Sequence, residues 1–250
     1  MPITVHPGGG SGTGAANIVT GPATPPLGSG SAYLATGPNH GDESAQLRNS
    51  GDWVGTKLGD LTALSYSTYA TASNATPPNV SQDTFFILYV NNSSVSGGAD
   101  RLFFEPVYSD GVDVVNPNGN QPAPALNTWQ NWNLLKGMWY SDNFGGPGSN
   151  ALTFSTLIAD EGAAATISDD TAHGLGGIRF TVGEGSPTDN FAVNVDAFSI
   201  GTAAGTTTYN FDPNPAAVPL PATAWGGMAL MGLLGVARLV RKPLADGVRA

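Results

Sequence analysis

The 250-residue sequence contains no cysteine. This absence excludes disulfide bridges, a thiol nucleophile and thiolate metal sites, and it is compatible with an oxidising or a reducing compartment. The HExxH, GxSxG, Walker-loop and EF-hand patterns are also missing. The histidines His6, His40 and His173 are isolated in Gly-rich turn contexts. The sequence therefore offers no motif for catalysis.

Basic residues are scarce in the first 217 positions. The chain has 9 Lys and Arg and 19 Asp and Glu, and residues 218–250 hold four of the basic residues and one acid, Asp246. Residues 1–217 are left with five basic and 18 acidic residues, a net charge of −13. A body this acidic repels phosphate backbones, so we expect no nucleic-acid partner.

Glycine and proline are abundant, with 34 and 19 residues, which fits many short strands joined by tight turns. Apolar or alternating stretches predict strands, with "TFFILYV" (84–90) in a buried central position. The other candidate strands are residues 61–70, 100–108, 128–135, 176–182 and 190–201, and residues 149–160 are the best short helix. We expect an all-β, antiparallel two-sheet jelly-roll sandwich over residues 15–212.

The stretch 190–201 predicts a break in strand alternation. Phe191, Val193 and Val195 share one face, whereas Phe198 and Ile200 fall on the other. A β-bulge near Asp196 would return both groups to the same side.

The C-terminus differs from the acidic body. Residues 222–237 are apolar or small throughout, and the basic residues Arg238, Arg241 and Lys242 follow. One interpretation is a buried helix of the globular domain. The stretch has no polar face, lies behind a Pro-rich linker (213–221) and is basic at one end only, which favours a transmembrane helix over 222–240 with a cytoplasmic tail at 241–250.

The residues Val218, Pro219, Leu220 and Pro221, the apolar helix and the basic tail together resemble the PEP-CTERM sorting signal. The resemblance implies an exosortase partner and export in a bacterium, with membrane anchoring followed by a place in the cell envelope or outside the cell. Leu220 stands where the family usually has Glu, and the tail continues through Pro243–Ala250.

The body, in pieces such as "RLFFEPVY", "NTWQNWNLLKGMWYS" and "NVDAFSIG", resembles an extracellular domain common in proteins that bear this signal. That resemblance implies a jelly roll without an assigned activity, associated with surface polysaccharide.

The N-terminus lacks a basic region, an apolar core and a cleavage site for secretion. A cytoplasmic protein is one interpretation. Because the C-terminus implies export, we expect instead a reading frame that begins too late, with residues 1–14 as a flexible Gly-rich segment.

Two groups of residues are candidate binding sites. Flat rings for a glycan could come from four aromatic residues, Trp129, Trp132, Trp139 and Tyr140. Of these, Trp129 and Trp132 should face opposite sides of one strand. The alternative is that all four are core residues.

Oxygen ligands for a structural Ca²⁺ are offered by Asp110, Asp113 and Asp196. The alternative is that these acidic turns are simply solvated, as such turns usually are.

Two functions from different classes follow. The first is a non-catalytic envelope or matrix protein whose jelly roll interacts with carbohydrate. The alternative is a hydrolase of surface polysaccharide, which would need two carboxylates roughly 5–9.5 Å apart in a cleft.

Overall fold

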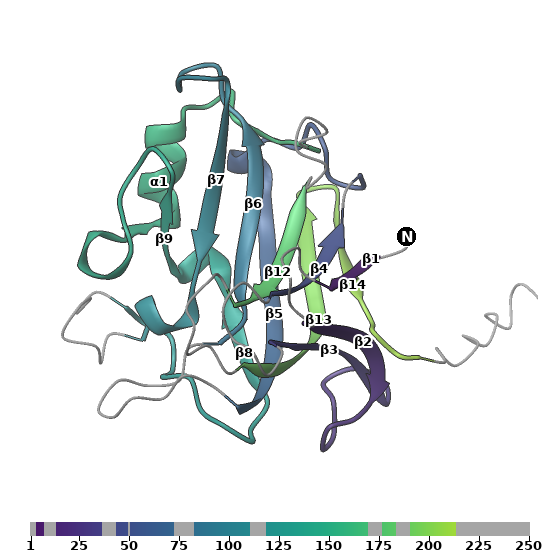
Figure 1. The fold of residues 1–250 in the computed structure, drawn as a ribbon. Helices are drawn as coiled ribbons and strands as arrows, with labels where there is room; N and C mark the ends of the chain where they lie inside the picture. Colours follow the sequence, from purple (N-terminus) through teal and green to yellow (C-terminus); the bar gives the residue numbers. More distant parts are fainter. Residues whose placement is uncertain are drawn as a thin grey trace, which may run out of the picture. The chain divides into compact units, whose positions relative to one another are not determined.

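The computed structural model describes residues 4–7, 14–36, 44–49, 51–72, 83–110, 119–169, 177–183 and 191–213. All of them belong to the unit Met1–Pro215. This part of the chain is mostly β, with two antiparallel sheets and one α-helix (Figure 1).

The larger sheet has the strand order β1-β4-β12-β6-β7-β9-β10, and β11 pairs with β6 beside this path. Its strands are β1 (Thr4–Pro7), β4 (Ala45–Asn49), β6 (Phe85–Asn91), β7 (Ala99–Phe104), β9 (Met138–Ser141), β10 (Leu152–Thr153), β11 (Thr166–Ile167) and β12 (Ile178–Val182).

The smaller sheet has the strand order β2-β3-β13-β5-β8, and β14 pairs with β13. Its strands are β2 (Ala15–Thr20), β3 (Gly30–Ala35), β5 (Leu61–Ala72), β8 (Gln130–Asn133), β13 (Ala192–Thr202) and β14 (Gly205–Tyr209). Short 3-10 turns lie at η1 (Leu58–Asp60), η2 (Pro106–Tyr108), η3 (Leu134–Lys136) and η4 (Gly148–Asn150).

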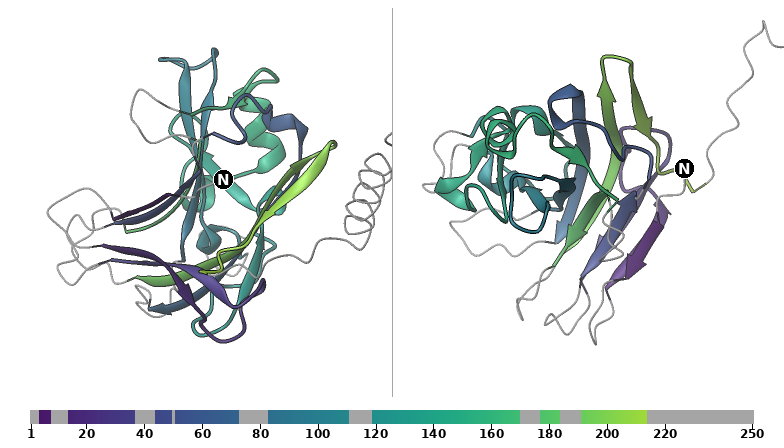
Figure 2. Two further views of the ribbon diagram at one scale, coloured as in Figure 1. Left: turned by 90° about the vertical axis from the view of Figure 1, so that its right-hand side faces the viewer. Right: turned by 90° about the horizontal axis from the view of Figure 1, so that it is seen from above.

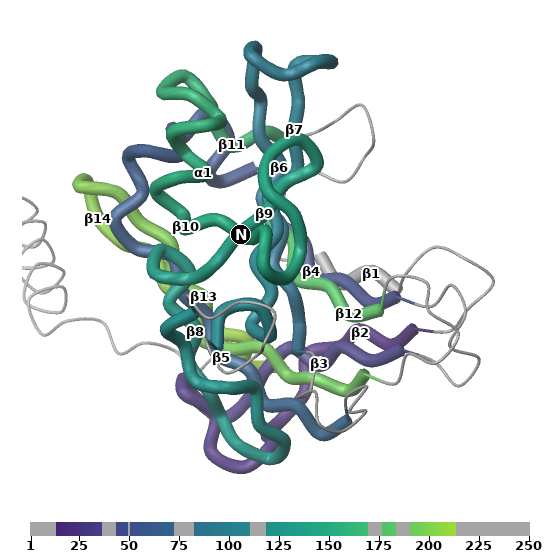
Figure 3. Tube along the Cα trace, turned by 90° about the vertical axis from the view of Figure 1, so that its left-hand side faces the viewer, coloured from purple at the N-terminus to yellow at the C-terminus, as the bar shows by residue number. Residues whose placement is uncertain are grey.

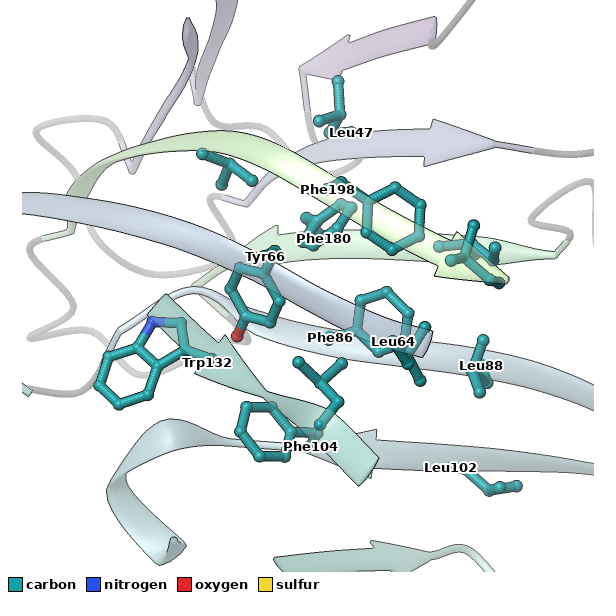
Figure 4. Packing of buried hydrophobic residues seen from close by; sticks show 14 of the residues in the cluster. Leu47, Leu64, Tyr66, Phe86, Leu88, Leu102, Phe104, Trp132, Phe180 and Phe198 are labelled. Carbon is teal, nitrogen blue, oxygen red and sulfur yellow. The ribbon is translucent and has the colours of Figure 1, made fainter. Parts of the chain in front are cut away.

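The two sheets pack face to face around an aromatic core. At one end of the molecule β1, β4 and β12 run alongside β2 and β3 (Figures 2 and 3). Between the layers, the ring of Phe180 lies 5.0 Å from Tyr66 and 5.1 Å from both Phe86 and Phe198 (Figure 4). Rings from both sheets therefore interlock, which excludes water from the interior.

Strand β6 is central, as the apolar run 84–90 predicts. It pairs with β12 on one side and with β7 on the other. Phe86, Leu88 and Val90 belong to the main core, whereas Ile87 and Tyr89 are buried on the opposite face.

The bulge predicted in β13 is present. The pairing with β5 shifts register between Asp196 and Ser199, and Ala197 has a φ of +51°. Because of this shift, Val193, Val195, Phe198 and Ile200 all reach the core.

The helix predicted over residues 149–160 begins later in the structure, at Phe154. Helix α1 spans Phe154–Glu161, and residues 149–153 form a turn and the short strand β10 instead. The Thr153 hydroxyl accepts the amide of Thr156 at 3.2 Å, so it caps the helix N-terminus and fixes the start. Gly162, with a φ of +86°, ends the helix.

Two predictions concern the ends of the chain. Residues 1–14 were expected to be a flexible segment, but Thr4–Pro7 form β1 and pair with β4. The β-branched Thr4 and Val5 favour extended backbone, and edge pairing accommodates Pro7.

The predicted linker, membrane helix and tail, residues 214–250, lie outside the described residues. Among the residues that are described, no helix is long and apolar enough to cross a membrane.

A buried polar network lies beneath β5. The Trp132 Nε1 donates to Thr68 Oγ1 at 2.8 Å, and Thr68 Oγ1 donates to Asp83 Oδ2 at 2.5 Å. The amide of Thr84 donates to Asp83 Oδ1 at 2.6 Å. Burial raises the pKa of Asp83 to about 6, although both hydrogen bonds act in the opposite direction.

We therefore expect Asp83 to make stability depend on pH. Its pKa is higher in the folded chain than the ordinary 3.8, so the folded state holds the proton more tightly. The free energy of unfolding should fall as pH rises from about 4 to about 6, by an amount on the order of 3 kcal/mol. Urea unfolding at several pH values measures this, and Asp83→Asn should remove that component. The exposed Asp60→Asn is the control, and an unchanged pH profile in Asp83→Asn would contradict the assignment.

Candidate functional site

The outer surface of the smaller sheet carries a row of alternating amide and aromatic side chains. Asn17 of β2 pairs with Tyr33 of β3, Tyr33 with Asn194 of β13, and Asn194 with Tyr69 of β5. Residues in register on one face are neighbours, so the row runs across four strands for about 15 Å at the usual strand spacing. We call this surface, with Trp129 and Asn131 beside it, the Tyr–Asn face.

Trp129 extends the row at Tyr69. The two ring centroids are 5.6 Å apart with planes tilted by 54°, and Trp129 Nε1 donates to the carbonyl oxygen of Pro22 at 3.1 Å. The half-buried Trp129 ring is thus fixed by one ring contact and one hydrogen bond. Three positions later Trp132 is fully buried, so the predicted contrast between one buried ring and one partly exposed ring is confirmed. Trp129 itself lies just before β8 and not on the strand.

The amides of the Tyr–Asn face are oriented by hydrogen bonds. The buried Asn194 donates from Nδ2 to Ser31 Oγ at 2.9 Å, and the exposed Asn131 donates from Nδ2 to Ser67 Oγ at 3.2 Å. Fixed amides and fixed rings make a preorganised surface, on which a ligand orders few side chains.

The Tyr–Asn face lacks exposed charge. Within the described strands of the smaller sheet, Asp196 is the single Asp, Glu, Lys, Arg or His, and it is fully buried. The side chains of this surface therefore offer ring contacts and neutral hydrogen bonds, and no charged groups.

The loop between β2 and β3 supports one end of the face. Asp196 Oδ2 accepts the amide of Leu27 at 2.8 Å, and the Ser31 hydroxyl donates to the Gly21 carbonyl. Gly28 has a φ of +62°, and a Cβ built there would lie 1.9 Å from Asp212 Oδ2. The loop needs glycine at that position, and its anchored path presents the Pro22 carbonyl to Trp129.

A second group of rings lies on the outer face of the larger sheet. Phe103 and Tyr140 stack at 5.0 Å, Arg101 lies over Phe103, and Arg179 lies over Tyr89 at 5.0 Å. Phe103 and Tyr89 are 7% and 4% exposed, so neither can offer its ring plane to a ligand. The Tyr–Asn face, with its half-buried rings, is the better candidate for binding.

The four predicted aromatic residues do not form one platform. Trp132 and Trp139 are 0% exposed, which corrects their assignment as glycan-binding residues. Trp139 packs against Phe104 and Phe154 and donates from Nε1 to the Leu134 carbonyl. Tyr140 lies on the larger sheet, with its hydroxyl donating to Glu105. Trp129 alone reaches the Tyr–Asn face.

The three predicted calcium ligands are not brought together within the described residues. Asp110 is buried after η2, Asp196 lies under the β2–β3 loop, and Asp113 is outside the described residues. Burial raises the pKa of Asp196, and the amides of Leu27, Ala197 and Phe211 act against that rise. In the described ranges no three Asp, Glu, His or Cys side chains gather as a metal-binding group.

Sequence reasoning missed Tyr33, Tyr69 and Asn194. The alternating pattern of β5 places Tyr69 on the face of the strand opposite to Leu64 and Tyr66, which point into the core. The outward direction of Tyr69 could therefore have been predicted from the sequence. Its alignment with Tyr33 and Asn194 depends on pairing between strands far apart in the chain, which no local pattern indicates.

No protein-family model, curated protein or solved structure matches the chain.

The different environments of Trp129 and Trp132 predict different stabilities for their alanine variants. Trp132→Ala leaves a cavity and removes the donor to Thr68, so it should lower the free energy of unfolding by about 3–5 kcal/mol. Trp129→Ala loses one hydrogen bond and a partly exposed ring contact, and should cost about 1 kcal/mol. Urea unfolding followed by circular dichroism measures both, and equal costs would contradict the assigned burial.

Proposed function

We propose that this chain is a non-catalytic, exported cell-envelope protein whose β-sandwich binds a neutral glycan on the Tyr–Asn face. The observation that carries the proposal is the row Asn17–Tyr33–Asn194–Tyr69, continued by Trp129 and free of exposed charge. Pyranose C–H faces stack on aromatic rings, and the exposed amides of Asn17 and Asn131 can bond hydroxyl groups. Asn194 is 3% exposed, so its amide supports the row from within rather than contacting the glycan.

The length and chemistry of the row favour an extended neutral chain over a single sugar. A surface about 15 Å long across four strands contacts several sugar residues in succession. The acidic body, with its net charge of −13 over residues 1–217, disfavours anionic polymers. The Tyr–Asn face also lacks the Arg and Lys side chains that bind carboxylate or sulfate groups.

The proposed architecture is a jelly roll, and the strand order supports it. The sheets contain the runs β3-β13-β5-β8 and β4-β12-β6-β7, and the chain moves between them from β3 to β4, β5 and β6. The late strands β12 and β13 each insert between two earlier strands, as in a Greek key. Such a fold leaves one broad sheet face open to a ligand.

Glycan binding is tested with the full chain on an array of neutral and anionic polysaccharides, followed by affinity electrophoresis on any that bind. Loss of one stacking ring should cost about 1–3 kcal/mol, by analogy with base–aromatic stacking, so Trp129→Ala and Tyr69→Ala should weaken binding about 5- to 150-fold. Tyr140→Ala, on the other sheet, is the matched control and should bind as the wild type does. Binding that survives in Trp129→Ala and Tyr69→Ala, or that is confined to anionic polymers, would refute this site.

We further propose that residues 218–250 anchor and sort the protein. Support comes from the order of Val218–Pro221, the apolar stretch and the basic residues ending at Lys242, which resembles the PEP-CTERM signal. An exosortase is then the processing partner, and the site of display is the envelope or the extracellular matrix.

Deletion of residues 218–250 should release the protein from the membrane fraction of an exosortase-containing host. Fractionation and immunoblotting measure the release, in a version of the gene that carries a secretion signal. A deletion of residues 243–250 alone keeps the motif and should remain membrane-associated. Identical fractionation of the 218–250 deletion and the wild type would rule out a sorting role.

A further inference from the structure

The last described residues of the chain are held against the β2–β3 loop. Asp212 Oδ1 accepts the backbone amide of Ser29 at 2.6 Å and the Ser29 hydroxyl at 3.3 Å. Asp212 Oδ2 accepts Asn210 Nδ2 at 3.1 Å, and the Asp212 amide donates to Asn210 Oδ1 at 3.0 Å. The Ser29 amide lowers the pKa of Asp212, so the carboxylate is ionised at neutral pH. We call the contact between Asp212 and Ser29 the exit clamp.

The loop is shaped to receive this carboxylate. A Cβ at Gly28 would lie 1.9 Å from Asp212 Oδ2, and a Cβ at Gly30 would lie 2.3 Å from Pro213 Cδ. The close approach on both sides of Ser29 therefore needs glycine, and the two glycines leave the Ser29 amide open to Asp212.

From Ser29 a continuous set of hydrogen bonds leads to Trp129. The Ser29 carbonyl oxygen accepts the amide of Gly21 at 2.8 Å. Pro22 is the next residue, and its carbonyl oxygen accepts Trp129 Nε1 at 3.1 Å. Three hydrogen bonds and the intervening backbone thus connect Asp212 to the indole ring, and a contiguous network of this kind can carry a displacement from one end to the other.

A branch of the same path reaches the centre of the Tyr–Asn face. The Ser31 hydroxyl donates to the Gly21 carbonyl and accepts Asn194 Nδ2 at 2.9 Å. Gly21 is therefore tied through its amide to the exit clamp and through its carbonyl to the amide that supports the row.

The β2–β3 loop has a second anchor, which does not involve Asp212. The Leu27 amide donates to Asp196 Oδ2 at 2.8 Å, and Asp196 is buried at the bulge of β13. The bond from Ser29 to Asp212 is exposed, so its removal opens no cavity in the core. Loss of the exit clamp should therefore loosen the Ser29 side of the loop without unfolding the sandwich.

We propose that Asp212 is a positioning residue for Trp129, because the exit clamp holds the Pro22 carbonyl where it fixes the indole ring on the Tyr–Asn face. The ring is thereby linked to the segment after Pro213, a few positions before the proposed anchor begins at Val218. A displacement of that segment that releases Asp212 also releases the ring. The consequence for affinity rests on the proposed glycan-binding function, whereas the positioning of the ring does not.

The test is NMR of the indole N–H groups in the ¹⁵N-labelled full chain, without any glycan. The five tryptophans give one signal each, assigned through single Trp→Phe variants. Asp212→Ala should move the Trp129 signal toward that of a free indole and speed exchange of its N–H with water about 2- to 10-fold, the effect of losing one net hydrogen bond. The Trp132 signal should not change, because its hydrogen bond to Thr68 is buried.

Three further variants test the path. Asp212→Asn keeps an oxygen for the Ser29 amide, so its Trp129 signal should lie closer to the wild type than to Asp212→Ala. Ser29→Ala removes only the hydroxyl, which makes the longer bond, and should leave the signal unchanged. Gly28→Ala places a Cβ against Asp212 and should reproduce Asp212→Ala, which covers the case in which Asp212→Ala fails to fold.

An unchanged Trp129 signal in Asp212→Ala would show that Asp196 alone holds the loop, and would overturn the proposal. Equal movement of the Trp129 and Trp132 signals would mean a general loss of structure, and would overturn it as well. The expected response in a protein that binds no polysaccharide on the array would support the positioning role while refuting the glycan-binding function.

Discussion

The bulge in β13 controls both the core and the surface of the smaller sheet. Regular alternation through Val193 and Val195 would direct Phe198 to solvent. The register shift after Asp196 instead places the Phe198 ring 5.1 Å from Phe180 and 5.8 Å from Phe86 of the larger sheet. The central strand of the smaller sheet thus contributes its side chains to the core before and after the bulge, which joins the two layers along its length.

The same bulge determines how the outer face is built. The carboxylate of Asp196 is buried at the shift and accepts the Leu27 amide, which anchors the β2–β3 loop. That loop brings the Pro22 carbonyl to Trp129, and Trp129 packs on Tyr69. The orientation of the ring that we assign to glycan binding thus depends, through three contacts, on a backbone irregularity in another strand. Binding surfaces on flat sheets need such support, because outward side chains have few neighbours to hold them.

Local patterns in the sequence predicted much of the fold and little of the site. The central place of β6 follows from its continuous apolar run, and the bulge near Asp196 follows from a break in period-two alternation, and both are patterns of neighbouring residues. The row of Tyr33, Asn194 and Tyr69 depends on register between strands more than 100 positions apart. Trp139 was misassigned because a large aromatic residue in a polar stretch gives no local indication of which layer it enters.

Three buried carboxyl groups show how tertiary packing determines the neighbours that change a carboxyl pKa. Burial raises the pKa of Asp83, Asp196 and Glu161 alike. For Asp83 the partners are a hydroxyl and an amide, which together bond both carboxylate oxygens. For Asp196 the Leu27 amide bonds Oδ2, whereas the buried Oδ1 has no hydrogen-bond partner. For Glu161, burial and then the Asp100 carboxyl raise the pKa, and the Asn92 amide, which donates to Glu161 Oε2, acts against that rise. The same cost of burial therefore gives three different ionisation behaviours, according to the neighbours that the fold brings to each carboxyl group.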